Sequence, residues 1–268
     1  MQKINIIGCG SMGSQIASLF SILGYEVSIW NRTKINKENI LRQKKLILKL
    51  LKIQDNNGLV TILKDLEELK NNITIECLAE DVELKKKFIT KINDKVNKEI
   101  FSNSSSIKTN TIHKRLNLLH FFNPISLKIV EFNKVHKLSN EAEMIFSDLK
   151  KMNFDLIKVE NFTGFAFNKI LFAEIANFFF LIEKENIDKV ELLRIFKKIN
   201  YNLNILSTLD LIGIDISLKI LENLKKEYNF YIPKILYMCK SKTIFGKKNK
   251  TTIKTIFDSP NYPTTTDD

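Results

Sequence analysis

The segment "KINIIGCGSMG", residues 3–13, restricts the fold of this 268-residue chain more than any other stretch. Its β-branched beginning predicts a strand, and the apolar spacing over 12–23 predicts an amphipathic helix. The glycines between them have the spacing Gly-x-Gly-x-x-Gly, which allows a tight turn, close approach of a pyrophosphate and close helix–strand packing. A glycine-rich turn without a ligand is the alternative. Because a helix N-terminus also offers N–H groups and partial positive charge to phosphates, the predicted dinucleotide contacts are Gly8, Gly10, Ser11, Met12 and Gly13.

The end of the second predicted strand, 26–30, bears on which nicotinamide dinucleotide would bind. About 20 residues after such glycines, an Asp or Glu accepts hydrogen bonds from the ribose hydroxyls of NAD. This chain has Asn31, Arg32 and Thr33 there, and a guanidinium beside a hydroxyl suits a 2′-phosphate. These residues therefore favour NADP, and stacking of Arg32 on the adenine ring is the alternative.

Short β-branched segments alternate with amphipathic segments as far as about residue 160. Such alternation predicts a parallel sheet with right-handed crossovers, that is, an α/β Rossmann-type, doubly wound domain. Beyond that point helical patterns predict an all-α domain, and three consecutive phenylalanines at 178–180 indicate that this domain packs on further apolar surface, including a second copy. We expect a dinucleotide-binding domain at 1–160, a helical domain at 161–254 and a disordered Pro/Thr/Asp-rich tail at 255–268.

The net charge of +12 raises the question of a nucleic-acid partner. The lysines, however, are spread over the whole length, and the sequence has no arginine-rich segment, zinc finger or RNA-binding aromatic motif. Nucleic acid is therefore not expected. Acidic small molecules and an acidic carrier protein both fit the charge.

Cysteine usage and hydropathy indicate an intracellular, soluble protein. Cys9, Cys77 and Cys239 are few, odd in number and without a ligand spacing, so neither a disulfide framework nor a metal site is expected. The most apolar stretch, 162–182, is interrupted by charged residues and is a poor membrane span. The chain begins directly with a predicted strand, so we expect it in the cytoplasm.

Several further motifs follow the glycine turn in a fixed order: "ECLAEDVELKKKF", "SNSSS", "HFFNP", "IVEF", "TGFAFNK" and "DLIGID". Their order and wording resemble the 3-hydroxyacyl-CoA dehydrogenase family, in its short form that includes the 3-hydroxybutyryl-CoA dehydrogenases. The resemblance covers roughly 3–245 and rests on six or seven separate motifs, which makes chance agreement improbable.

Under this resemblance His120 is the general base and Glu131 the residue that orients it. Oxidation of a secondary alcohol releases a proton from oxygen as a hydride leaves carbon, and imidazole titrates near neutral pH. A carboxylate on the second ring nitrogen would fix the tautomer and stabilise the imidazolium. Without the resemblance, His120 lies among apolar neighbours and reads as a core side chain.

The resemblance also implies roles for polar residues outside this pair. Ser105, with Asn103 beside it, matches the serine that bonds the substrate oxygen, and Asn168 matches the asparagine that helps to hold that oxygen. Glu80 and Lys85 match residues that line the cofactor and substrate side of the site. A helix-capping turn is the alternative for the serines, and a polar residue on a packed helix is the alternative for Asn168.

Three departures from the family pattern qualify these expectations. Asn31 replaces the usual acidic residue, and the chain between the Asn-Pro dipeptide and Glu131 is one residue shorter than the common spacing. The insertion at 34–59 is shorter than the helical pair that clamps coenzyme A in the family, so the acyl carrier is open.

The residues and the resemblance together predict an NAD- or NADP-dependent oxidoreductase that interconverts 3-hydroxyacyl and 3-oxoacyl thioesters. The helical domain is expected to pair two subunits. One alternative is a related dehydrogenase acting on a hydroxyacyl group bound to an acyl carrier protein, as in the synthesis of polyketide extender units. The other is a dinucleotide-binding protein that has lost catalysis.

Overall fold

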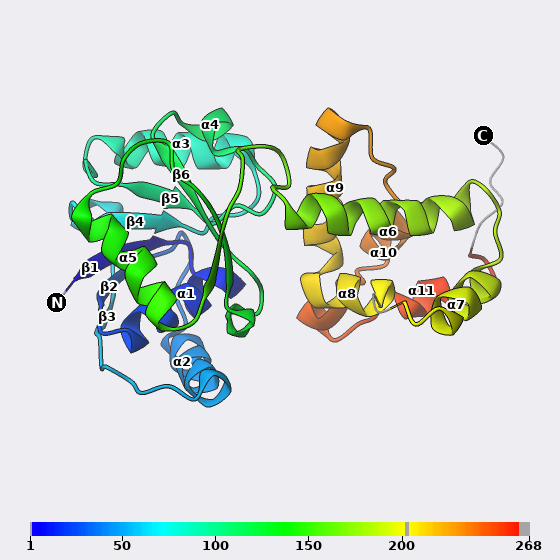
Figure 1. Ribbon diagram of the computed structural model, residues 1–268, viewed down its shortest axis with the longest axis horizontal. Helices are drawn as coiled ribbons and strands as arrows, with labels where there is room; N and C mark the ends of the chain where they lie inside the picture. Colours follow the sequence, from blue (N-terminus) through cyan, green and yellow to red (C-terminus); the bar gives the residue numbers. More distant parts are fainter. Residues whose placement is uncertain (1, 202–203, 263–268) are drawn as a thin grey trace. The chain divides into compact units, whose positions relative to one another are not determined.

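The computed structural model describes residues 2–201 and 204–262 (Figure 1). It consists of two compact units, of which the first ends at Phe165 and the second begins at Ala166. This division lies five residues after the expected boundary at 160/161. Each unit has its own hydrophobic core.

The first unit is built on one eight-stranded sheet with the order β3-β2-β1-β4-β5-β6-β7-β8. All neighbouring strands are parallel except β6 and β7, which run antiparallel because only a short turn joins them, too short for a crossover. The sequence predicted a Rossmann-type sheet followed by an all-α region, and this fold class is confirmed. The strands are β1 (Lys3–Ile7), β2 (Glu26–Trp30), β3 (Val60–Ile62), β4 (Ile73–Glu76), β5 (Ile100–Ser102), β6 (Leu116–Phe121), β7 (Ile129–Asn133) and β8 (Asp155–Lys158).

Helices cover both faces of this sheet, so its central strands are buried on both sides (Figure 1). One core contains residues of α1, α2 and α5, and the other contains residues of α3, α4 and η1. The helical elements are α1 (Ser11–Ile22), α2 (Lys37–Leu51), η1 (Leu66–Glu68), α3 (Val82–Asn93), α4 (Thr109–Ile112), η2 (Ile125–Leu127) and α5 (Asn140–Lys151).

The second unit consists of helices around a core that is rich in phenylalanine and leucine. Gly213 has a φ of 102°, which suits glycine, and it ends one helix before the next begins. The elements are α6 (Phe167–Glu183), α7 (Lys189–Lys198), α8 (Ile205–Ile212), α9 (Ile214–Tyr228), α10 (Lys234–Ser241), η3 (Gly246–Asn249) and α11 (Lys254–Phe257).

The C-terminal segment differs from the disordered tail expected at 255–268. Its first residues belong to α11, and Phe257 and Tyr262 are each only 2% exposed. The Tyr262 hydroxyl donates to Glu183 at 2.8 Å, and the Lys189 ammonium bonds three backbone carbonyls of this segment. Buried aromatic rings therefore outweigh the polar composition as far as residue 262, whereas 263–268 lie outside the described residues.

Candidate active site

The glycine turn has the geometry that its sequence predicts. Gly8 has a φ of 95°, and a Cβ there would lie 2.6 Å from the Cys77 carbonyl oxygen. A Cβ on Gly13 would lie 2.0 Å from the Gly8 oxygen, so helix α1 packs directly against the turn. A Cβ on Gly10, by contrast, would meet nothing within 4 Å. The first and third glycines are thus needed for packing, and the second leaves open space at the helix N-terminus that suits a pyrophosphate.

Helix α1 begins at Ser11, and no side chain caps its first turn. The first N–H groups of a helix have no partner within the helix, so the turn that contains Ser11 and Met12 can receive an anion. From the next turn, Gln15 donates to Asn123 Oδ1 at 3.2 Å and accepts from the Ile125 N–H at 3.0 Å. Helix α1 is therefore attached to the loop that follows His120.

At the end of β2, the Asn31 side chain is held by hydrogen bonds within the chain. Its Oδ1 accepts from the Cys9 N–H at 3.1 Å, and its Nδ2 donates to the Thr33 carbonyl and hydroxyl oxygens at 3.1 and 2.9 Å. Arg32 and Thr33 are exposed. The neutral amide of Asn31 thus joins the glycine turn to the loop after β2. It stands where the family pattern has an acidic residue, so no negative charge is present there.

His120 and Glu131 lie directly opposite each other in the antiparallel β6–β7 pair. His120 Nδ1 is 2.9 Å from Glu131 Oε2, and the two residues are 7% and 1% exposed. The shortened connection therefore does not displace Glu131, because the strand register sets its position opposite His120.

Aromatic rings surround the imidazole. The rings of Phe122 and Phe165 have centroids 5.2 and 6.1 Å from that of His120. Phe165 is fully buried and has a φ of 46°, which is unfavourable for a bulky residue. Backbone strain of this kind persists only where the surrounding structure imposes it.

The serine-rich loop follows β5 and is held at both ends. Asn103 Oδ1 accepts from the Phe121 N–H at 2.8 Å, next to His120, and the Asn103 N–H donates to the Glu76 carbonyl at 2.8 Å. The Ser105 N–H and hydroxyl lie 3.0 and 3.3 Å from Glu80 Oε1. Asn103 therefore connects the loop to the strand that carries the histidine.

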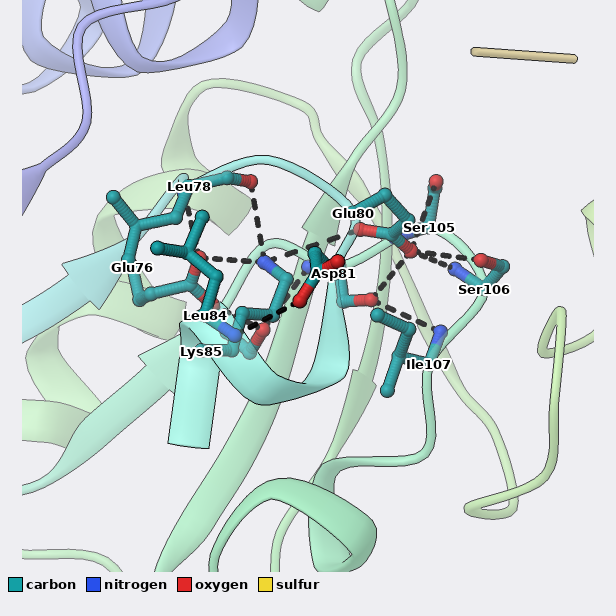
Figure 2. A network of polar contacts seen from close by, with 11 residues as sticks. Glu76, Leu78, Glu80, Asp81, Leu84, Lys85, Ser105, Ser106 and Ile107 are labelled. Carbon is teal, nitrogen blue, oxygen red and sulfur yellow. Dashed lines mark hydrogen bonds and ion pairs between the residues drawn. The ribbon is translucent and has the colours of Figure 1, made fainter. Parts of the chain in front are cut away.

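Beneath this loop lies a buried ionic cluster of Glu76, Glu80 and Lys85 (Figure 2). The Lys85 ammonium is 2.5 Å from Glu76 Oε1, 3.2 Å from the Leu78 carbonyl oxygen and 3.9 Å from Glu80 Oε2. Glu76 also accepts from the Ser102 hydroxyl at 2.7 Å across the β4–β5 pair. Lys85 was expected to line the cofactor side of the site, but the structure places it at 0% exposure with its ammonium bonded inside this cluster.

The cluster fixes the charge of its members. Burial opposes ionisation of Glu80, but Lys85 and the serine donors outweigh it and hold the Glu80 pKa below its ordinary value of 4.5. Burial likewise disfavours the Lys85 cation, but Glu76 and Glu80 outweigh it and raise the Lys85 pKa above its ordinary value of 10.5. Glu80 is therefore ionised and Lys85 protonated at neutral pH.

The lowered Glu80 pKa predicts a contribution to acid unfolding. Because this pKa is lower in the folded state, the stabilisation is complete above the ordinary value of 4.5 and is lost as the pH falls through the folded-state pKa. In Glu80→Gln, the free energy of unfolding should therefore decrease less steeply as the pH falls from 7 to 3. Urea unfolding at successive pH values measures this slope. Glu83→Gln, at a side chain that is 82% exposed, is the control. Equal pH dependence in both variants would contradict the assignment.

Asn168 belongs to the second unit, where it is the second residue of α6 and is 7% exposed. Its expected contact with the substrate oxygen stays a prediction. Among the described residues, no group of three or more His, Cys, Asp or Glu side chains could hold a metal ion. Within residues 2–201 and 204–262, no helix is long and apolar enough to cross a membrane.

Comparison with known families assigns the chain to one of them. Residues 3–155 match the model of the 3-hydroxyacyl-CoA dehydrogenase NAD-binding domain, and residues 164–258 match that of the 3-hydroxyacyl-CoA dehydrogenase C-terminal domain. The chain belongs to the 3-hydroxyacyl-CoA dehydrogenase family. The resemblance seen in the motifs is thereby confirmed, and so is a nicotinamide cofactor site in the first unit.

Relatives within this family align over most of the chain. A 3-hydroxybutyryl-CoA dehydrogenase of Clostridioides difficile is 28% identical over 254 residues, which are 84% of this chain and 88% of the relative. The fatty acid oxidation complex subunit alpha of Pseudomonas entomophila is 25% identical over 238 residues, 80% of this chain but 33% of that protein. Among solved structures, FadB2 of M. tuberculosis superposes with a TM-score of 0.81 at 21% identity, covering 94% of this chain and 98% of that one.

Sequence reasoning did not identify two residues that the structure places next to the predicted site residues. Glu76 begins the motif "ECLAEDVELKKKF" but was not predicted to be a site residue. A glutamate at the end of a buried strand requires a buried partner, and this signal could have identified it. Phe165 lies in the "TGFAF" motif, and only its backbone conformation and its place beside the imidazole distinguish it from a core phenylalanine.

Proposed function

We propose that this chain interconverts 3-hydroxyacyl and 3-oxoacyl thioesters with a nicotinamide dinucleotide. The buried His120–Glu131 pair, at 2.9 Å across β6 and β7, carries the proposal. A histidine held by a carboxylate beside a dinucleotide turn is suited to proton exchange that accompanies hydride transfer. Family membership supports the same reaction class.

In this mechanism His120 donates its Nδ1–H to Glu131, so its Nε2 faces the substrate oxygen. As the alcohol becomes a carbonyl, Nε2 takes up the hydroxyl proton, and Glu131 stabilises the resulting imidazolium. A nicotinamide dinucleotide held at the turn of Gly8, Gly10 and Gly13 would supply or accept the hydride. Ser105 and Asn168 hold the reacting oxygen, as the family resemblance implies. The phenylalanines beside the ring exclude water from it.

The thioester assay tests this proposal. Purified protein should oxidise NADH or NADPH on addition of acetoacetyl-CoA, followed by absorbance at 340 nm. Turnover of an acetoacetyl group on an acyl carrier protein, without turnover of the coenzyme A thioester, would instead support the carrier-protein alternative. Dinucleotide binding without turnover of either substrate would support a non-catalytic protein. The segment 34–59 contains the helix α2. The assay decides whether the acyl group is carried by coenzyme A or by a carrier protein.

We propose further that the loop after β2 selects NADP. Asn31 supplies an amide in place of a carboxylate, so a 2′-phosphate meets no negative charge there, and Arg32 is exposed for bidentate phosphate binding. Arg32→Ser should weaken NADPH binding by about tenfold and leave NADH binding within about twofold, as measured by fluorescence titration. A clear preference of the unaltered protein for NADH would overturn this assignment.

We also propose that the protein is a cytoplasmic homodimer that associates through its second unit. This unit exposes large apolar side chains along α6 and α7, including Ile170 at 65% and Val190 at 66%. Exposed apolar area of this kind is typical of an interface. Light scattering coupled to size-exclusion chromatography should give about twice the chain mass of 31.2 kDa.

A further inference from the structure

Three consecutive serines enclose one oxygen of the Glu80 carboxylate (Figure 2). Glu80 Oε1 has five donors within hydrogen-bond distance: the hydroxyl of Ser104, and the N–H and hydroxyl groups of both Ser105 and Ser106. The distances run from 2.6 to 3.3 Å. Successive N–H groups in a turn form an anion-binding concavity, and here a carboxylate of the chain itself fills it. Glu80 thus determines the conformation of the serine loop.

The second oxygen of Glu80 faces Lys85, which is itself held from below by Glu76 and the Leu78 carbonyl. Two carboxylates share this one buried ammonium. A buried ionic group of this kind contributes little net stability compared with a well-packed apolar core. We therefore take its contribution to be geometric: it gives Glu80 a fixed position and a permanent negative charge.

The serine loop in turn supports the residues around the imidazole. The Ser106 carbonyl accepts from the Gly164 N–H at 3.1 Å, and Phe165 follows immediately. The strained Phe165 backbone is stabilised by a bond from its N–H to the Phe162 carbonyl at 3.1 Å. Its ring then packs beside that of His120. A continuous series of contacts therefore leads from Lys85 through Glu80 and Ser106 to the histidine.

We propose that Glu80 is a positioning residue that fixes the Ser105 hydroxyl and, through Ser106 and Gly164, the Phe165 ring beside His120. The inference rests on the proposed function for the roles of Ser105 and His120. It differs from the sequence expectation, in which Glu80 lines the cofactor side of the site. A residue that only supports the fold would affect stability, whereas a positioning residue affects the geometry of this loop and the turnover number.

Glu80→Gln is the variant that tests the proposal. If the oxygen of the new glutamine amide faces the serines, its nitrogen faces the Lys85 ammonium. Both of these groups are hydrogen-bond donors, so they repel each other. If the nitrogen faces the serines, it cannot accept from their donors. Glu83→Gln is the matched control, because it makes the same change three residues along the chain at a side chain that is 82% exposed. Ser106→Ala, which removes one of the five donors, is the second test variant should Glu80→Gln not fold.

Two measurements should be made on each variant. Hydrogen exchange, followed by mass spectrometry over 103–107 and 162–166, reports on the N–H groups of Ser105, Ser106 and Gly164 without requiring activity. Exchange there should rise about tenfold or more in Glu80→Gln, because the acceptor that closes this loop is impaired. The turnover number should fall by about 10- to 100-fold, and NAD(P)H affinity should stay within about twofold.

The outcomes separate this inference from the proposed function. Exchange and turnover equal to those of Glu83→Gln would overturn it. Faster exchange with unchanged turnover would reduce Glu80 to a fold-supporting residue, and weaker dinucleotide binding as the main effect would place it in the cofactor site; both overturn it as well. If the unaltered protein turns over no thioester, the proposed function fails, and the exchange measurement still decides whether Glu80 orders both segments.

Discussion

Replacing His120 with glutamine should lower the turnover number by about 10²-fold or more and leave NAD(P)H binding intact. Glutamine nearly preserves the size of the side chain and can still donate a hydrogen bond to Glu131. It cannot take up a proton near neutral pH, so the step that releases the hydroxyl proton loses its base. The variant should be compared with the unaltered protein by steady-state kinetics at 340 nm and by fluorescence titration with the reduced dinucleotide.

His136→Gln is the control for this experiment, because His136 is exposed and outside the site. Glu131→Gln should lower turnover by less than His120→Gln does, since the base remains while the charge that stabilises the imidazolium is lost. Near-wild-type turnover of His120→Gln would remove His120 from the mechanism. Loss of dinucleotide binding in that variant would indicate a folding defect instead.

Replacing Lys85 with methionine should lower the free energy of unfolding by about 3–5 kcal/mol at pH 7, because two buried carboxylates then lack their cation. Methionine fills most of the volume of the lysine stem, so packing is largely retained and the loss reflects the uncompensated charge. Urea unfolding followed by circular dichroism measures the change.

The neighbouring Lys86 offers a matched control. Its ion pair with Glu83 joins side chains that are 43% and 82% exposed, so Lys86→Met should change stability by no more than about 1 kcal/mol. Adding Glu76→Gln to Lys85→Met should restore part of the loss, because it removes the carboxylate that lies 2.5 Å from the missing ammonium. If Lys85→Met and Lys86→Met are equally stable, the buried cluster does not have the electrostatic role assigned to it.

Local sequence signals predicted the conformation of the glycine turn correctly. The conformation and packing of Gly8 and Gly13 follow from their spacing between a strand and a helix, because each acts within a few residues of itself. The helix expected over 12–23 likewise forms, as α1. The interruption at Gly213 and the packing of Tyr262 were not predicted, because both depend on partners that are distant in the sequence.

The sequence identified His120 and Glu131 as a pair only through the family resemblance. Their spacing of eleven residues does not by itself bring the two side chains together. The connection between the Asn-Pro dipeptide and Glu131 is also one residue shorter than in the family pattern, so the family spacing did not establish the contact. The antiparallel register of β6 and β7 decides it, because residues directly opposite in such a pair are adjacent in space.

By itself, then, the sequence determined the type of fold, the dinucleotide turn and the family, since these depend on periodicity and on short motifs. Only the tertiary structure decided that Lys85 is buried with its ammonium bonded to Glu76, and that Glu80 holds the serine loop 24 to 26 residues away. The physical reason lies in the sheet. Parallel pairing brings the ends of β4 and β5 together, and burial there requires each charge to find a partner, which the linear order of residues does not specify.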